Sequence, residues 1–133
     1  MLILLLVLQL SGSGPLSESD QATVQAAAVR HYLSQNPIRG EICLAVGGYK
    51  APSKGLRLLL KGIRLEKDEN CHFRKGGLVV SVTRALLLSN GLAELQVSKL
   101  EFDDVSSRGE GHTYKLERAH QSWRVVSEGD GVQ

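Results

Sequence analysis

The hydrophobic period of this sequence changes along the chain, and that change restricts the folds it can adopt. Residues 20–35 read DQATVQAAAVRHYLSQ, an Ala-rich stretch whose apolar residues recur at helical spacing. From Gly76 onward the apolar residues follow the period of strands instead. One long helix followed by consecutive strands predicts an α+β domain, with the helix packed on one face of a curved, mostly antiparallel sheet.

The ends of the long helix are marked in the sequence. Ser17 stands three residues before Asp20, so we expect Ser17 to cap the helix and Asp20 to lie near the positive end of its dipole. Asn36-Pro37 ends it, because the residue before proline is pushed out of the helical region. The expected buried stripe consists of Val24, Ala27, Ala28, Val29, Tyr32 and Leu33.

Shorter elements complete the predicted domain. A strand is expected over residues 41–46, and Ser53 caps a short second helix. The apolar side of that helix carries Leu56, Leu59, Leu60 and Ile63.

The later strands are expected over residues 77–88 and 92–102 and in a final hairpin that turns at 119–122. Residues 103–111 read as a polar connection. The alternation of apolar residues slips at Lys99-Leu100, which predicts a β-bulge or a change of sheet face.

The first ten residues, MLILLLVLQL, are apolar except for Gln9, and small residues follow at once. This layout is typical of a secretory signal peptide, with Ser11 and Ser13 before the cleavage site. No Lys or Arg precedes the apolar run, so a core element or a start codon placed too late are the alternatives. The apolar run therefore predicts a secreted or periplasmic protein. A length of 133 residues predicts a single domain. Its expected segments are a signal peptide (1–13), a linker (14–18), the α+β domain (19–128) and a flexible tail (129–133).

The chain contains two Cys. Outside the cytoplasm, Cys43 and Cys71 are expected to form a disulfide with each other. Two unpaired buried thiols are one alternative. A zinc site is another, but the sequence has neither a CxxC nor an HxxxH pattern, so no metal and no cofactor are expected.

The ending YKLERAHQSWRVV resembles the terminal hairpin of cystatin-like and NTF2-like α+β rolls: an aromatic-X-Leu strand, a polar turn and then Trp-X-Val. The long N-terminal helix fits those folds too. The chain is also similar to small exported bacterial proteins of unknown function, through RHYL, ICLAV, APS and the late second Cys. These resemblances imply a cystatin-like or NTF2-like roll.

The sequence contains no GxSxG, Walker, GxGxxG or HExxH motif. His112 follows a short connection that carries Asp103 and Asp104, so an Asp–His pair could act as a general base, as in some NTF2-like enzymes. A solvated acidic loop beside a surface histidine is the alternative interpretation.

Basic residues gather in the predicted second helix, beside its apolar side. Such a stripe predicts weak contact with an anionic membrane surface, and a solvated cationic face is the alternative. No aromatic residues are interleaved with it as single-stranded nucleic acid requires, so no nucleic-acid partner is expected. The stripe consists of Lys54, Arg57, Lys61 and Arg64.

Two functions follow from these patterns. The first is a secreted or periplasmic, non-catalytic module that binds a protein, an envelope component or a small ligand. The alternative is a small NTF2-like pocket enzyme that uses Asp103 or Asp104 with His112. The lack of a convergent catalytic set of residues favours the first.

Overall fold

The computed structural model describes residues 14–47, 50–68, 71, 78–102 and 107–130. The expected signal peptide (1–13) lies outside them. The elements within these ranges are β1 (Gly14–Pro15), α2 (Glu18–Gln35), β2 (Cys43–Val46), α3 (Lys54–Leu59), β3 (Leu78–Val82), β4 (Leu86–Leu87), β5 (Ala93–Phe102), β6 (Ser107–Ala119) and β7 (Ser122–Asp130).

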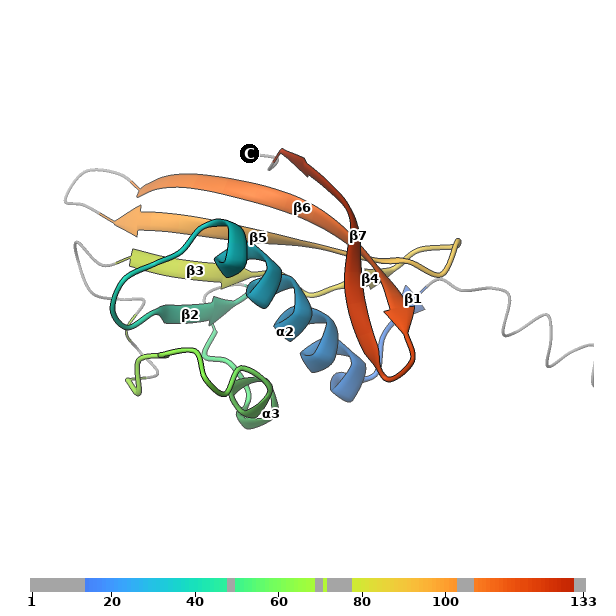
Figure 1. Cartoon of the computed structure of the whole chain (residues 1–133), viewed down its shortest axis with the longest axis horizontal. Coiled ribbons are helices and arrows are strands. Elements are labelled where there is room, and N and C mark those ends of the chain that lie inside the picture. The colour runs from blue at the N-terminus through green and yellow to red at the C-terminus, as the bar shows by residue number, and fades with distance from the viewer. Residues whose placement is uncertain (1–13, 48–49, 69–70, 72–77, 103–106, 131–133) are drawn as a thin grey trace, which may run out of the picture.

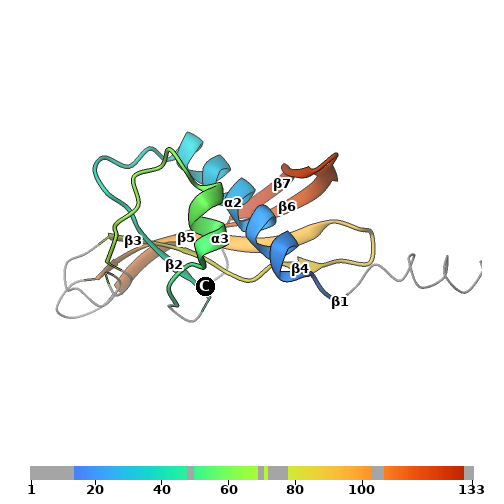
Figure 2. The same cartoon turned by 90° about the horizontal axis from the view of Figure 1, so that it is seen from below.

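The strands form one mixed sheet built around β5. One edge of β5 pairs with β6, which pairs with β7, and the other edge pairs with β3 and β4. Of the pairings between these strands, only that of β2 with β3 is parallel. Both helices cover the same face of the sheet, and the far end of the β6–β7 hairpin bends toward α2 (Figures 1 and 2). The predicted α+β architecture is therefore confirmed.

Helix α2 supplies one side of the main core. The Asp20 N–H donates to Ser17 Oγ at 3.2 Å, which confirms the predicted cap, and the helix ends before Asn36. Its buried stripe packs against side chains at alternate positions of β5 and β6. Each large apolar side chain buried there contributes about 1.5–3 kcal/mol to folding. The core includes Val24, Ala28, Val29, Tyr32, Val80, Val82, Leu95, Val97, Tyr114 and Leu116.

The single strand predicted over residues 77–88 is wrong, because β3 ends at Val82 and β4 begins at Leu86. Two glutamines of α2 form hydrogen bonds with the backbone of the segment between β3 and β4. Gln21 donates to Ala85 O at 2.7 Å and accepts from the Ala85 N–H at 2.9 Å, and Gln25 donates to Thr83 O at 3.1 Å. The helix thereby satisfies backbone groups of this segment, while the Thr83 N–H still donates to Gln96 O of β5 at 2.9 Å.

The predicted bulge at Lys99-Leu100 is wrong, since β5 pairs with both neighbours there without a register shift. The other interpretation, a change of sheet face, agrees with the pairing. Leu100 stands opposite Val79, and Val79 belongs to a small core with Cys43, Ala45 and Cys71. These residues lie on the face away from α2, because they alternate with the main-core residues of β2 and β3.

Other expected boundaries shift. Strand β6 begins at Ser107, so residues 107–111 of the expected polar connection belong to a strand. Strand β7 continues to Asp130, which takes in the first two residues of the expected tail, and β1 lies within the expected linker. Helix α3 has the predicted Ser53 cap but ends at Leu59. Leu56 and Leu60 of its expected apolar side are buried, whereas Leu59 is 41% exposed.

Candidate functional site

A groove with a volume of about 540 Å³ runs between α2 and β7. Its α2 wall is built from residues spaced three and four apart, and two of them are alanines. Because an alanine side chain is a single methyl group, this face of the helix leaves the groove open. The lining residues from α2 are Thr23, Ala26, Ala27, Arg30 and His31. Leu59 of α3 and residues 121–125 complete the groove.

Trp123 forms part of the β7 wall, and Arg118, which does not line the groove, packs against its ring. The Arg118 guanidinium lies 4.5 Å from the centre of the Trp123 ring, a cation–π contact, and its Nη2 is 3.1 Å from Asp20 Oδ2. The buried indole N–H of Trp123 has no acceptor within the described part of the chain. An acceptor brought by a ligand would satisfy this donor.

The edges of the groove carry arginines. Arg30 Nη2 donates to Leu59 O at 2.9 Å and to Lys61 O at 2.8 Å, which ties α3 to α2. Arg124 is paired with the carboxylate of Glu117. Among the described residues no carboxylate pairs with Arg30, so its positive charge is available to a ligand.

His31 connects the groove to a group of four aromatic rings beneath the end of α2. The His31 ring meets the edge of Tyr114 at a centroid distance of 5.2 Å. His112 stacks on Tyr114 at 6.0 Å and lies 5.6 Å from the Tyr32 ring. We call these four residues the ring cluster.

A β-bulge brings Glu128 to the ring cluster. Leu116 pairs with Val125 but Lys115 pairs with Ser127, so Val126 has no opposite residue. This extra residue lets Val125 face the core and still turns Glu128 to the same side, opposite Tyr114. Glu128 Oε2 lies 3.9 Å from His31 Nε2, and Gln35 Nε2 donates to Glu128 Oε1 at 3.5 Å.

Three polar atoms of the ring cluster are buried without a hydrogen-bond partner among the described residues: His31 Nε2 and the hydroxyls of Tyr32 and Tyr114. Burial, followed by the charge of Glu128 and by Tyr32, raises the pKa of Tyr114 to about 12. Burial and then Glu110 raise the pKa of Tyr32 as well. Both phenols therefore stay protonated at neutral pH and can donate hydrogen bonds. Buried polar groups without partners are rare in folded proteins, so the cluster is a candidate position for a bound water or a ligand group.

The predicted Asp–His pair is only partly described. His112 lies within β6 rather than at its start, and it faces α2 with Tyr114, opposite Val97. Asp103 and Asp104 lie outside the described residues, so their pairing with His112 stays a prediction. Sequence reasoning missed His31 and Glu128, which are 97 positions apart and meet only because of the bulge.

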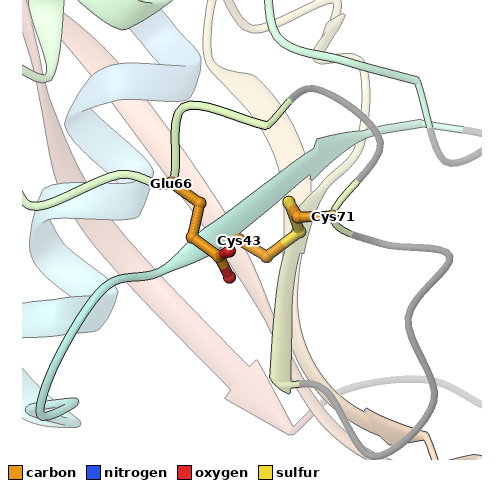
Figure 3. Close-up of side chains that lie close together, drawn as sticks. All are labelled: Cys43, Glu66 and Cys71. Atoms are coloured by element: carbon orange, nitrogen blue, oxygen red, sulfur yellow. A yellow bond between two sulfur atoms is a disulfide. The ribbon is translucent and has the colours of Figure 1, made fainter.

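The predicted disulfide is confirmed. Cys43 of β2 and Cys71 are bonded, with their Cα atoms 5.8 Å apart (Figure 3). The carboxylate of Glu66 lies beside the two sulfurs (Figure 3).

The four residues of the predicted basic stripe lie on two kinds of structure. Lys54 and Arg57 belong to α3, whereas Lys61 and Arg64 follow its end. Arg57 is half-buried, and its Nη1 donates to Glu66 O at 3.1 Å. The other three side chains are exposed.

Comparisons of the chain with family models, with curated proteins and with solved structures found no match. In the described part of the chain, no helix combines the length and the apolar character needed to cross a membrane.

Proposed function

We propose that this protein is an exported, non-catalytic module that binds a small amphipathic anion in the groove between α2 and β7. The observation that carries the proposal is the composition of the groove: an apolar floor with the charged Arg30 at its edge. The apolar floor is formed by Ala26, Ala27, Leu59, Trp123 and Val125.

The size of the groove favours a small ligand over a protein partner. Small-molecule sites typically have volumes of about 300–1,000 Å³, which includes the value found here. Eleven residues line the groove, whereas a stable protein interface involves about 20–30 residues on each partner. An envelope component with a single acyl chain and an acidic head has the required chemistry.

Export is supported by the apolar run in residues 1–13 and by the disulfide, which persists in oxidising compartments. We expect the mature chain to begin near Gly14, and N-terminal sequencing of exported protein tests this. Recovery of intact Met1 from the extracellular fraction would contradict it. We also propose a cystatin-like or NTF2-like roll, supported by the long helix on a bent, mostly antiparallel sheet and by the terminal hairpin.

The chain contains one Trp, and that residue lines the groove, so its fluorescence reports binding directly. Dodecanoate, dodecanol and dodecylamine, which share a chain length and differ in charge, should be titrated separately. We expect dodecanoate to bind most tightly and dodecylamine most weakly. No change in Trp123 fluorescence with any of the three would contradict the proposal.

Two variants with matched controls test the position of the ligand. Ala27→Phe fills the groove and should weaken dodecanoate binding at least tenfold, whereas Ala51→Phe, at an exposed position outside the groove, should not. Arg30→Gln should remove the preference for dodecanoate over dodecanol, and Arg39→Gln should leave it unchanged. Equal binding by Ala27→Phe and the parent protein would place the ligand elsewhere.

The alternative, a pocket enzyme with a histidine base, has one supporting observation. His31 lies close to Glu128 and beside Tyr114, so an imidazole and a carboxylate are near each other independently of Asp103 and Asp104. The 3.9 Å between His31 Nε2 and Glu128 Oε2 exceeds hydrogen-bond distance, which favours the binding function. Chemical conversion of a bound ligand that His31→Gln abolishes would favour the enzyme instead.

A weak contact with an anionic membrane surface is a separate part of the proposal. Leu58 is 74% exposed on α3, next to the basic stripe, which suits a membrane interface. Binding to phosphatidylglycerol vesicles should fall steeply with salt and should be lost in the double variant Lys54→Glu, Lys61→Glu. Lack of binding at low salt would leave the stripe as a solvated face.

A further inference from the structure

We propose that Cys43, Cys71 and Glu66 form a redox-gated site for zinc or a similar divalent cation. When the disulfide is reduced, its two sulfurs become thiolates, and together with the Glu66 carboxylate they provide three ligands for the ion. The two Sγ atoms and a carboxylate oxygen of Glu66 lie within 4.8 Å of one another (Figure 3). Cys43 and Cys71 lie on the face of the sheet away from α2, so the proposed site is separate from the groove.

The distances suit a single ion. Zinc binds thiolate sulfur at about 2.3 Å and carboxylate oxygen at about 2.0–2.2 Å, so two sulfurs on one tetrahedral ion stand about 3.8 Å apart. After reduction the bonded sulfurs need to separate by only about 2 Å, within the reach of side-chain rotation. The Cα positions can therefore stay where they are.

Backbone hydrogen bonds place the three donors independently of the disulfide. Ile42 N–H donates to Arg64 O at 2.7 Å and Glu66 N–H donates to Ile42 O at 2.9 Å, which sets Glu66 beside the start of β2. Cys43 is paired with Val79 of β3, and Cys71 N–H donates to Asp68 O at 3.2 Å. Because these bonds do not involve the disulfide, Cys43 and Glu66 stay side by side after it opens, and the turn at Asp68 keeps Cys71 only a few residues along the chain from Glu66.

The surroundings favour a cation once the thiols are free. Both cysteines are buried against Ala45 and Val79, while Glu66 is half-buried and gives the site a side open to solvent. Two thiolates and a carboxylate so close together repel each other in an apolar environment, and a divalent cation relieves that repulsion. With three protein donors, a tetrahedral ion keeps one position for water.

The ion binds in two steps: reduction of the disulfide and then exchange of the thiol protons for the metal. A dithiol reductant supplies two electrons and two protons, so the sulfur–sulfur bond breaks to two thiols and the reductant becomes a disulfide. Zinc then displaces the two thiol protons and binds both thiolates and Glu66. A disulfide oxidant reverses both steps: it accepts two electrons and two protons to become a dithiol, the sulfur–sulfur bond re-forms, and the ion is released.

The test uses the full chain with tris(carboxyethyl)phosphine, which is converted to its oxide as it reduces the disulfide. Cobalt(II) is added as the probe, followed by competition with zinc. Reduced protein should develop the thiolate-to-cobalt charge-transfer absorption and bind zinc at least a hundredfold more tightly than oxidised protein. Reduced protein that binds zinc no more tightly than oxidised protein overturns the proposal, whether or not it keeps its fold.

Glu66→Gln separates the proposed site from simple binding by two thiols. It keeps the shape of the side chain but removes the anionic donor, so zinc affinity should fall at least tenfold in the reduced state. Glu41→Gln, an exposed carboxylate near the start of β2, is the matched control and should bind zinc like the parent. Equal affinity in Glu66→Gln and Glu41→Gln would remove Glu66 from the site and overturn the three-donor proposal.

Discussion

The two ends of α2 bury polar side chains in opposite ways. Near its start, both Gln21 amide atoms bond to the backbone of Ala85, and Gln25 bonds to Thr83. Near its end, the hydroxyl of Tyr32 and the Nε2 of His31 are buried without a hydrogen-bond partner among the described residues.

This difference separates a structural polar site from a candidate functional one. The glutamines supply the hydrogen bonds that the interrupted strand cannot make, so their burial is compensated within the fold. The ring cluster leaves donors unused, and unused buried donors are where a bound water or ligand group is expected. The groove between α2 and β7 ends at that same cluster, through His31.

The largest expected change in stability tests the comparison at the start of the helix. Gln21→Leu leaves the Ala85 N–H and C=O buried without partners, and each such group costs about 1–3 kcal/mol. We expect the free energy of unfolding to fall by about 2–4 kcal/mol in urea denaturation. Gln35→Leu, an exposed glutamine of the same helix, should change it by less than about 0.5 kcal/mol. Equal losses in the two variants would refute the distinction.

Alkaline pH tests the burial of the tyrosines. The pKa of Tyr114 is raised to about 12, compared with about 10 for an unfolded tyrosine. The folded protein therefore binds this proton more tightly, and the resulting stabilisation is present below pH 10 and is lost between pH 10 and about 12. Urea midpoints measured from pH 8 to 11.5 should fall more steeply in the parent than in Tyr114→Phe. Parallel curves would show that this phenol titrates as if exposed.

The smallest expected change in stability tests the comparison at the end of the helix. Tyr114→Phe removes a hydroxyl without a partner among the described residues, so at pH 7 stability should stay within about 0.5 kcal/mol of the parent or rise by up to about 1 kcal/mol. Tyr32→Phe should behave alike. Thermal and urea denaturation measure both. A loss of more than about 1 kcal/mol in either variant would mean that its hydroxyl is already hydrogen-bonded in the folded protein.

Local signals in the sequence predict most of the elements. Ser17 and Ser53 cap the two helices as expected, because capping depends on a side chain and a backbone group only three residues apart. The turns at Gly91 and at residues 120–121 are also encoded locally, and Gly91 adopts the positive φ of 87° that its turn requires. The disulfide was predictable from two cysteines and an expected export signal.

The break between β3 and β4 could not be predicted in this way. Residues 77–88 are apolar and β-branched throughout, so their pattern indicates one strand. At the interruption, Gln21 and Gln25, about sixty residues earlier in the chain, hydrogen-bond the backbone of Ala85 and Thr83. The bulge at Val126 is also a non-local feature, because its position depends on how β7 aligns with β6.

By itself, the sequence predicted the α+β class, the caps of both helices, the end of α2, the turns at Gly91 and at residues 120–121, and the disulfide between Cys43 and Cys71. These depend on periodicity, capping and composition, which act over a few residues or count residues of one type. Tertiary structure alone decided that Ala26 and Ala27 line a groove rather than only favour a helix. It also decided that Glu128 lies close to His31 and that Glu66 lies close to the disulfide. Those contacts join residues far apart in the chain, and they exist because strand register and helix placement bring the side chains together.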